Sequence, residues 1–124
     1  MIPPRVLICG ANSPALQTIA QVLSEEGVKV RTTISIIDCL YCSDLEWDFL
    51  LVDLDRPTRN LLGLLPAIRC QFPDLQVIGV ATQSTPDTRL LKNSLELDDY
   101  LFRFPRPEDI NRLFSACNSL GGAS

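Results

Sequence analysis

Two carboxylates in the middle of the chain are placed where they could do chemistry. An apolar run, residues 49–52 (Phe-Leu-Leu-Val), is followed by Asp53 and Asp55, and Pro57 comes two positions later. The run is too short for a helix, and its composition suits a strand that is buried on both faces. Open sheets of parallel strands form their binding sites at the carboxyl ends of such strands. Asp53 is therefore a candidate site residue, although a carboxylate in this place can also simply cap a turn.

A second candidate for chemistry is the pair Cys39 and Cys42, which has the C-x-x-C spacing of redox and metal sites. The chain has no histidine and no second C-x-x-C pair, so it lacks the four ligands of a zinc site. The pair is expected inside a helix over residues 34–42, whereas a redox pair opens a helix. The five cysteines are an odd number, which fits a reducing compartment better than a disulfide framework. The sequence thus predicts a cytoplasmic protein without a functional dithiol.

Length and charge narrow the class of protein further. The 124 residues suit one domain, expected over residues 1–120, with residues 121–124 as a tail or the start of a linker. The net charge of −4 argues against a nucleic-acid surface. No apolar run approaches the roughly 20 residues that cross a bilayer, and the N-terminus lacks the apolar region of a signal peptide. We therefore expect no membrane contact and no direct nucleic-acid contact.

The elements that must position the carboxylates alternate regularly along the chain. Helices are predicted to begin at Pro14 and at Pro86, because the N-cap residues Ser13 and Thr85 are each followed by proline at the first helical position. A last helix is predicted to begin at Pro107. Five strands alternating with five helices predict an α/β, flavodoxin-like (βα)5 three-layer sandwich with a parallel sheet in the order 2-1-3-4-5. In that order the ends of the first and third strands meet beside Asp53. The predicted strands are residues 5–9, 28–32, 47–53, 75–80 and 100–104.

Four segments carry a resemblance that extends along essentially the whole chain. They are Asp48-Phe-Leu-Leu-Val-Asp53-Leu-Asp-Arg-Pro57, Asn60-Leu-Leu-Gly-Leu-Leu-Pro-Ala-Ile-Arg69, Phe72-Pro-Asp-Leu-Gln-Val-Ile78 and Asp98-Asp-Tyr-Leu-Phe-Arg103. With these segments the chain resembles the receiver domain of two-component response regulators. The resemblance implies a non-enzymatic signalling domain of a phosphorelay, without a cofactor, whose partners are proteins such as a histidine kinase. It puts Asp53 in the phosphoacceptor position and Tyr100 in the position of the switch aromatic.

The acidic pair that the resemblance implies at the end of the first strand is missing. Receiver domains hold a magnesium ion with that pair, and this chain has Gly10 and Ala11 there. The metal offsets the charge of the incoming phosphoryl group and of the acceptor carboxylate. Asp53 with Asp55 is a poor substitute for the pair. The pattern indicates a degenerate receiver, or pseudo-receiver, without a metal site and without catalytic residues.

Two further positions of the resemblance have changed. The hydroxyl residue at the end of the fourth strand is replaced by Ala81, with Thr82 one place on, and the lysine at the end of the fifth strand is replaced by Arg103. Arginine's planar fork can hold a carboxylate with two hydrogen bonds, which lysine cannot do. We therefore predict an Asp53–Arg103 ion pair, direct or through one water, that stands in for the metal and lowers the pKa of Asp53. The alternative is that the long side chain of Arg103 extends into solvent.

A second resemblance has less support. Leu7-Ile-Cys-Gly10-Ala-Asn-Ser13 is similar to the opening of short-chain dehydrogenases. That family needs further glycines near the pyrophosphate of its cofactor, and this chain has Pro14 and Leu16 in those places. The sequence therefore argues against nucleotide binding there.

Three classes of function remain open. The favoured one is a non-catalytic signalling module that acts through protein contacts; the others are a phosphoacceptor that uses Asp53 and a small-molecule-binding flavodoxin-like domain. For the first, the resemblance implies a contact surface formed by the helix that begins at Pro86, the strand 100–104 and the helix that begins at Pro107. Phe104, Leu90 and Leu91 support it as apolar residues of this region. The adjacent pair Asp98-Asp99 is interpreted as a solvated turn.

Overall fold

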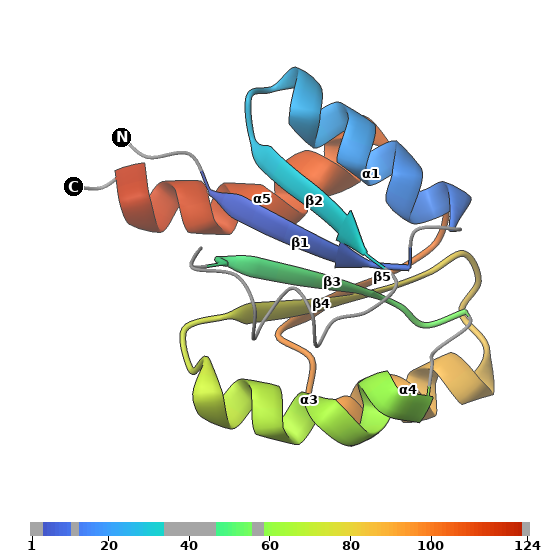
Figure 1. The fold of residues 1–124 in the computed structure, drawn as a ribbon. Coiled ribbons are helices and arrows are strands. Elements are labelled where there is room, and N and C mark those ends of the chain that lie inside the picture. The colour runs from blue at the N-terminus through green and yellow to red at the C-terminus, as the bar shows by residue number, and fades with distance from the viewer. Residues whose placement is uncertain (1–3, 11–12, 34–46, 56–58, 123–124) are drawn as a thin grey trace.

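The computed structural model describes residues 4–10, 13–33, 47–55 and 59–122, without the side chains of 59–62 and 115–122. The predicted helix over residues 34–42, together with Cys39 and Cys42, lies outside the described residues. Figure 1 shows the arrangement of the elements, and its labels are used below. The strands are β1 (Arg5–Cys9), β2 (Lys29–Thr33), β3 (Phe49–Asp53), β4 (Gln76–Ala81) and β5 (Asp99–Phe102). The helices are α1 (Pro14–Glu25), α3 (Arg59–Gln71), α4 (Pro86–Leu95) and α5 (Pro107–Gly122).

The five strands form one parallel sheet in the order β2-β1-β3-β4-β5. Helices α1 and α5 cover one face, and α3 and α4 cover the other (Figure 1). The predicted fold class and strand order are therefore confirmed. Strands β1 and β3 are neighbours, so the chain after Cys9 and the carboxylate of Asp53 meet at one edge of the sheet.

Strand β3 contributes to two hydrophobic cores, one on each face of the sheet. Phe49 and Leu51 belong to the core under α1 and α5, where the ring of Phe49 meets that of Phe114 edge-on at 4.8 Å. Leu50 and Val52 belong to the core under α3 and α4. Alternate residues of a strand point to opposite faces, so a strand buried on both sides has an uninterrupted apolar run.

Local signals fix the starts of two helices. The hydroxyl of Ser13 accepts the backbone N–H of Leu16, and Pro14 is the first residue of α1. Thr85 and Thr88 exchange side-chain and backbone hydrogen bonds at the start of α4, which forms a capping box. Among the described helices, none is long and apolar enough to cross a membrane.

Candidate functional site

Gly10 and Asp53 lie against each other at the carboxyl edge of the sheet. Gly10 follows β1 and has φ +131, a conformation that residues with a side chain rarely adopt. Its N–H donates to the carbonyl of Thr33 at 3.1 Å, which holds this conformation in place. A Cβ at position 10 would lie 2.9 Å from Cβ of Asp53 and 2.9 Å from Cδ1 of the buried Leu16. The backbone here therefore has no room for the acidic side chain that receiver domains carry.

The carboxylates of Asp53 and Asp55 connect β3 to the loop after β4. Asp53 is the last residue of β3 and is half-buried, and its Oδ1 accepts the N–H of Asp55 at 2.9 Å. Oδ2 of Asp55 in turn accepts the N–H of Thr82 at 2.9 Å. The hydrogen bond from the N–H of Asp55 shows that Asp53 caps its turn, which is one of the two roles predicted for it. Asp53 keeps its place at the site edge as well, so the two interpretations are compatible.

Leu54, between the two carboxylates, anchors this loop. It is fully buried, and its N–H donates to the carbonyl of Val80 at 2.8 Å. Its side chain packs over Gly79 of β4, where a Cβ would lie 2.6 Å from Cδ1 of Leu54 and 2.5 Å from Cδ1 of Leu97. A glycine in β4 therefore makes the space that holds the loop after Asp53 against the sheet.

The predicted Asp53–Arg103 ion pair is wrong, because Arg103 pairs with Asp109 of α5. Nε of Arg103 donates to Oδ2 of Asp109 at 3.2 Å, and Nη2 donates to Oδ1 of the same carboxylate. The backbone N–H of Arg106 also donates to Oδ2, at 3.0 Å. Strand β5 ends at Phe102, so Arg103 lies beyond the strand that was expected to point it at Asp53. Its nearest carboxylate is then the one in the first turn of the following helix.

The two partners of this ion pair differ in burial and shift each other's pKa. The side chain of Asp109 is 2% exposed, whereas that of Arg103 is 54% exposed. The hydrogen bond from Arg103 holds the pKa of Asp109 below its ordinary value; burial acts in the opposite direction, and the backbone N–H of Arg106 adds to the lowering. The same hydrogen bond raises the pKa of Arg103. Asp109 therefore stays ionised and joins β5 to the start of α5.

Asp109→Asn is expected to lower the free energy of unfolding at neutral pH. It should also make the free energy of unfolding depend less on pH in the acid range. A carboxyl group whose pKa is lowered by folding stabilises the fold above its unfolded pKa of about 4, and this contribution disappears as the pH falls through the folded pKa. The wild type should therefore lose stability more steeply than the variant below about pH 4. Urea midpoints measured between neutral pH and about pH 3 test this. Glu108→Gln, in the same helical turn, is the matched control, and parallel wild-type and Asp109→Asn curves would contradict the assignment.

The remaining predicted positions lie in different surroundings. Ala81, the last residue of β4, is fully buried, and Thr82 is exposed and linked through its backbone to Asp55. Tyr100 of β5 lies on the α4 side, where Nζ of Lys92 is 3.8 Å from the centre of its ring. Ala11 lies outside the described residues. Of the predicted set, the structure thus brings Gly10, Asp53, Asp55 and the backbone of Thr82 together.

The described residues do not fit the magnesium ion that the resemblance implies. Gly10 has no side-chain oxygen, and the place of a side chain there is filled by Asp53 and Leu16. The carboxylate of Asp55 is directed to the N–H of Thr82. Within the described residues, no group of three or more His, Cys, Asp or Glu side chains could hold a metal ion. The described residues therefore offer no set of side-chain ligands for a metal ion at this edge of the sheet.

Asp98 has a structural role that the interpretation as a solvated turn missed. Its Oδ2 accepts the N–H of Val77 at 2.7 Å, and Arg69 of α3 donates to both of its oxygens at 3.2 and 3.3 Å. Asp98 therefore connects α3, β4 and the start of β5. Asp109, also missed, had a recognisable signal: an acidic residue at the third position of a helix that begins with Pro107.

Comparison of sequences identifies one distant relative. No family model matches the chain. The DNA-binding transcriptional regulator NtrC of Azospirillum brasilense is 28% identical over 111 residues, which cover 89% of this chain and 22% of that protein. The chain thus spans about a fifth of the length of the relative it matches.

Solved structures resemble this chain over nearly its whole length. A CheY-like receiver domain protein from Methanospirillum hungatei has a TM-score of 0.75 at 18% identity, covering 99% of this chain and 100% of that one. A two-component response regulator from Legionella pneumophila has a TM-score of 0.76 at 20% identity, with 94% and 98% covered. An orphan response regulator of H. pylori has a TM-score of 0.66 at 22% identity, with 94% of each chain covered. The chain therefore has the fold of a response-regulator receiver domain.

Proposed function

We propose that this chain is a receiver-like signalling domain that acts through protein–protein contacts, and that Asp53 is not phosphorylated in the usual magnesium-dependent way. The observation that carries the proposal is the contact between Gly10 and Asp53. A side chain at position 10 would lie 2.9 Å from Cβ of Asp53, so the place of the first metal ligand is closed. Without a cation, a phosphoryl group would bring its negative charge directly against the Asp53 carboxylate.

The pairing of Arg103 supports the same proposal. Arg103 stands at the position where the resemblance implies a lysine that contacts the phosphoryl group. Here both hydrogen-bonding nitrogens on one side of the Arg103 fork donate to Asp109, whose carboxylate is buried. Withdrawing Arg103 from that pair would leave Asp109 buried without its ionic partner, which is unfavourable. Arg103 is thus engaged by a contact that does not involve Asp53.

Incubation with acetyl phosphate and magnesium is expected to leave the mass of the protein unchanged, and beryllofluoride should not bind. The reason is that Gly10 offers no side-chain ligand for a metal, and that Arg103 is paired with Asp109. Intact-mass spectrometry measures the first result and fluorine NMR the second. A receiver domain that keeps its acidic pair, treated in parallel, shows that the reagents are active.

A phosphoacceptor domain is the second candidate, because Asp53 is in place at the carboxyl end of β3 and half-buried. Stoichiometric phosphorylation that Asp53→Asn abolishes would establish this candidate and overturn the first. A histidine kinase would then be the partner expected to supply the phosphoryl group.

We propose that partner contacts are made by the α4–β5 surface, defined here by Leu90, Tyr100, Phe102 and Phe104 and continuing to the start of α5. Leu90 is 64% exposed, Phe104 50% and Tyr100 38%. The rings of Tyr100 and Phe102 are 4.9 Å apart, so the two form one aromatic patch. Contiguous exposed apolar patches mark sites of protein contact, and the Tyr100–Phe102 pair with the exposed Leu90 and Phe104 makes this region the candidate. The net charge of −4 is consistent with a protein partner and no direct contact with nucleic acid.

Arg89→Glu combined with Leu90→Glu is expected to abolish self-association or partner binding through this surface. A homodimer here would be isologous, so each substitution acts twice across the interface. Light scattering over a range of concentrations measures the oligomeric state, and pull-down with the cognate kinase measures partner binding. Ser24→Glu, on an exposed position of α1, is the control. The surface would be ruled out if the wild type stays monomeric and the double variant binds the partner as well as the wild type does.

A further inference from the structure

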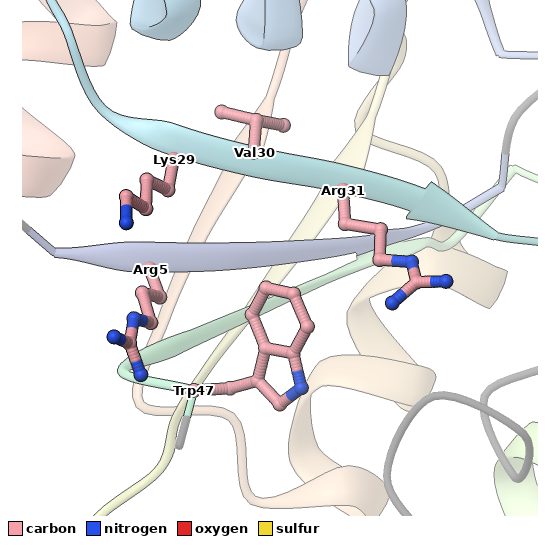
Figure 2. A pocket seen from close by; sticks show the side chains of 5 residues that line it. All are labelled: Arg5, Lys29, Val30, Arg31 and Trp47. Carbon is pink, nitrogen blue, oxygen red and sulfur yellow. The ribbon is translucent and has the colours of Figure 1, made fainter. Parts of the chain in front are cut away.

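A basic pocket lies at the amino end of the sheet, opposite the edge that carries Asp53. Arg5 is the first residue of β1 and Lys29 the first residue of β2, and Trp47 lies two residues before β3. Together with Val30 and Arg31, they line a pocket of about 230 Å³. Figure 2 shows the five side chains, with the indole ring of Trp47 between those of Arg5 and Arg31.

The strand register brings the three cations to one face of the sheet. Arg5 is paired with Lys29, and Leu7 is paired with Arg31, so the side chains at positions 5, 29 and 31 point the same way. That is the face of Leu7 and of the core against which Trp47 packs. Within the described part of the chain, none of the three cations forms an ion pair. A chain with a net charge of −4 therefore gathers three unneutralised positive charges in one place.

The side chains that line this pocket offer hydrogen-bond donors only. Arginine, lysine and the indole N–H donate and do not accept, and valine does neither. The nearby carboxylate of Asp48 accepts the backbone N–H of Arg5 at 2.8 Å, which directs it to the main chain. These side chains therefore favour a ligand that brings the acceptors, and anionic acceptors would balance the charge.

Two of these donors are buried without a partner. Nε of Arg5 and Nε1 of Trp47 are closed off from solvent and, among the described residues, have no hydrogen-bond acceptor. Buried polar groups in folded proteins are nearly always paired, and each exception requires an explanation such as an ordered water or an ion. Both donors belong to residues that line the same pocket.

We propose that this pocket binds a small aromatic anion, a single ring that carries a carboxylate or a phosphate. The ring stacks against the indole of Trp47, as aromatic rings commonly do. The anionic group lies against the cationic side chains beside the indole, Arg31 on one side of it and Arg5 and Lys29 on the other, where charge-assisted hydrogen bonds are available. A volume of about 230 Å³ is below the range of roughly 300–1,000 Å³ for drug-sized ligands, which favours one ring over a dinucleotide. The inference is independent of whether Asp53 is phosphorylated.

The protein contains a built-in reporter for this site, because Trp47 is its single tryptophan. Benzoate and phenyl phosphate are expected to bind saturably at millimolar or lower concentration, seen by titration calorimetry and as a change in tryptophan fluorescence. Cyclohexanecarboxylate, which keeps the charge and lacks the aromatic face, should bind more weakly than benzoate. Inorganic phosphate tests the anion alone and should bind most weakly.

Arg31→Gln is expected to weaken benzoate binding by about tenfold or more, since it removes a charge-assisted hydrogen bond. Lys29→Gln, at another exposed position, is a second variant with the same expectation. Arg112→Gln changes the net charge equally on a distant helix and should leave binding unchanged, as should Asp53→Ala at the other end of the sheet. Absence of saturable binding by both aromatic anions, or equal weakening by Arg112→Gln, would overturn the proposal.

Discussion

Gly10→Asp, which restores an acidic residue where receiver domains have one, is expected to lower the free energy of unfolding by about 2–4 kcal/mol. Two effects add. The backbone at φ +131 is strained for any residue with a side chain, and the new Cβ would lie 2.9 Å from Cβ of Asp53 and from Cδ1 of Leu16. The added carboxylate would also face that of Asp53. Urea unfolding with and without magnesium measures the result, and magnesium is expected to recover little of the loss.

Two alanine variants separate the causes. Gly10→Ala keeps both the strain and the crowding, whereas Gly27→Ala at φ +85 has strain alone, since no atom lies within 4 Å of its Cβ position. We expect Gly10→Ala to be the more destabilising of the two. A Gly10→Asp protein as stable as the wild type, and further stabilised by magnesium, would show that the site can be rebuilt by one substitution.

Leu54→Ala is expected to cost about 2–5 kcal/mol, since it leaves a cavity between the loop after β3 and the sheet. Gly79→Ala should cost about 1–3 kcal/mol by overpacking, because its Cβ would lie 2.6 Å from Leu54 and 2.5 Å from Leu97. In the double variant the new methyl group enters space that the leucine has vacated. The double variant should therefore cost less than the sum of the single ones.

Chemical denaturation of the wild type, the two single variants and the double variant gives the coupling energy between positions 54 and 79. Leu23→Ala, in the core on the other face of the sheet, is the control partner for Gly79→Ala. That pair should be additive within about 0.5 kcal/mol. Additivity of the Leu54 and Gly79 effects would instead show that the two residues do not compete for the same space.

The fold could be predicted because its signals are local and repeated. An uninterrupted apolar run such as Phe-Leu-Leu-Val in β3 requires burial on both faces, and strands of that kind separated by helices leave few topologies. Proline after Ser13 or Thr85 marks a helix start for reasons that lie within four residues. These local signals do not depend on contacts with distant parts of the chain.

The location of the site could be predicted from the sequence, but the partners of its side chains could not. The strand order alone places Asp53 beside Gly10. The partner of Arg103 depends on where β5 ends, and the expected strand over residues 100–104 was two residues too long at its carboxyl end. That error placed Arg103 on the sheet edge, whereas the chain has already turned toward Asp109.

Asp98 illustrates a different gap between sequence and structure. Its partner Arg69 is 29 residues away, and nothing in the local sequence indicates that the two side chains meet. An Asp-Asp pair in a polar stretch has the composition of a solvated turn. Only the packing of α3 against the sheet brings the guanidinium to the carboxylate.

The position of β2 has a consequence for how copies of this chain can meet. Strand β2 is the outermost of the described strands, next to β1, and an outer strand edge can recruit a strand from another molecule. Lys29 and Arg31 stand on that edge and repel the same residues of a second copy. The cations of the pocket thereby protect the sheet against edge-to-edge aggregation.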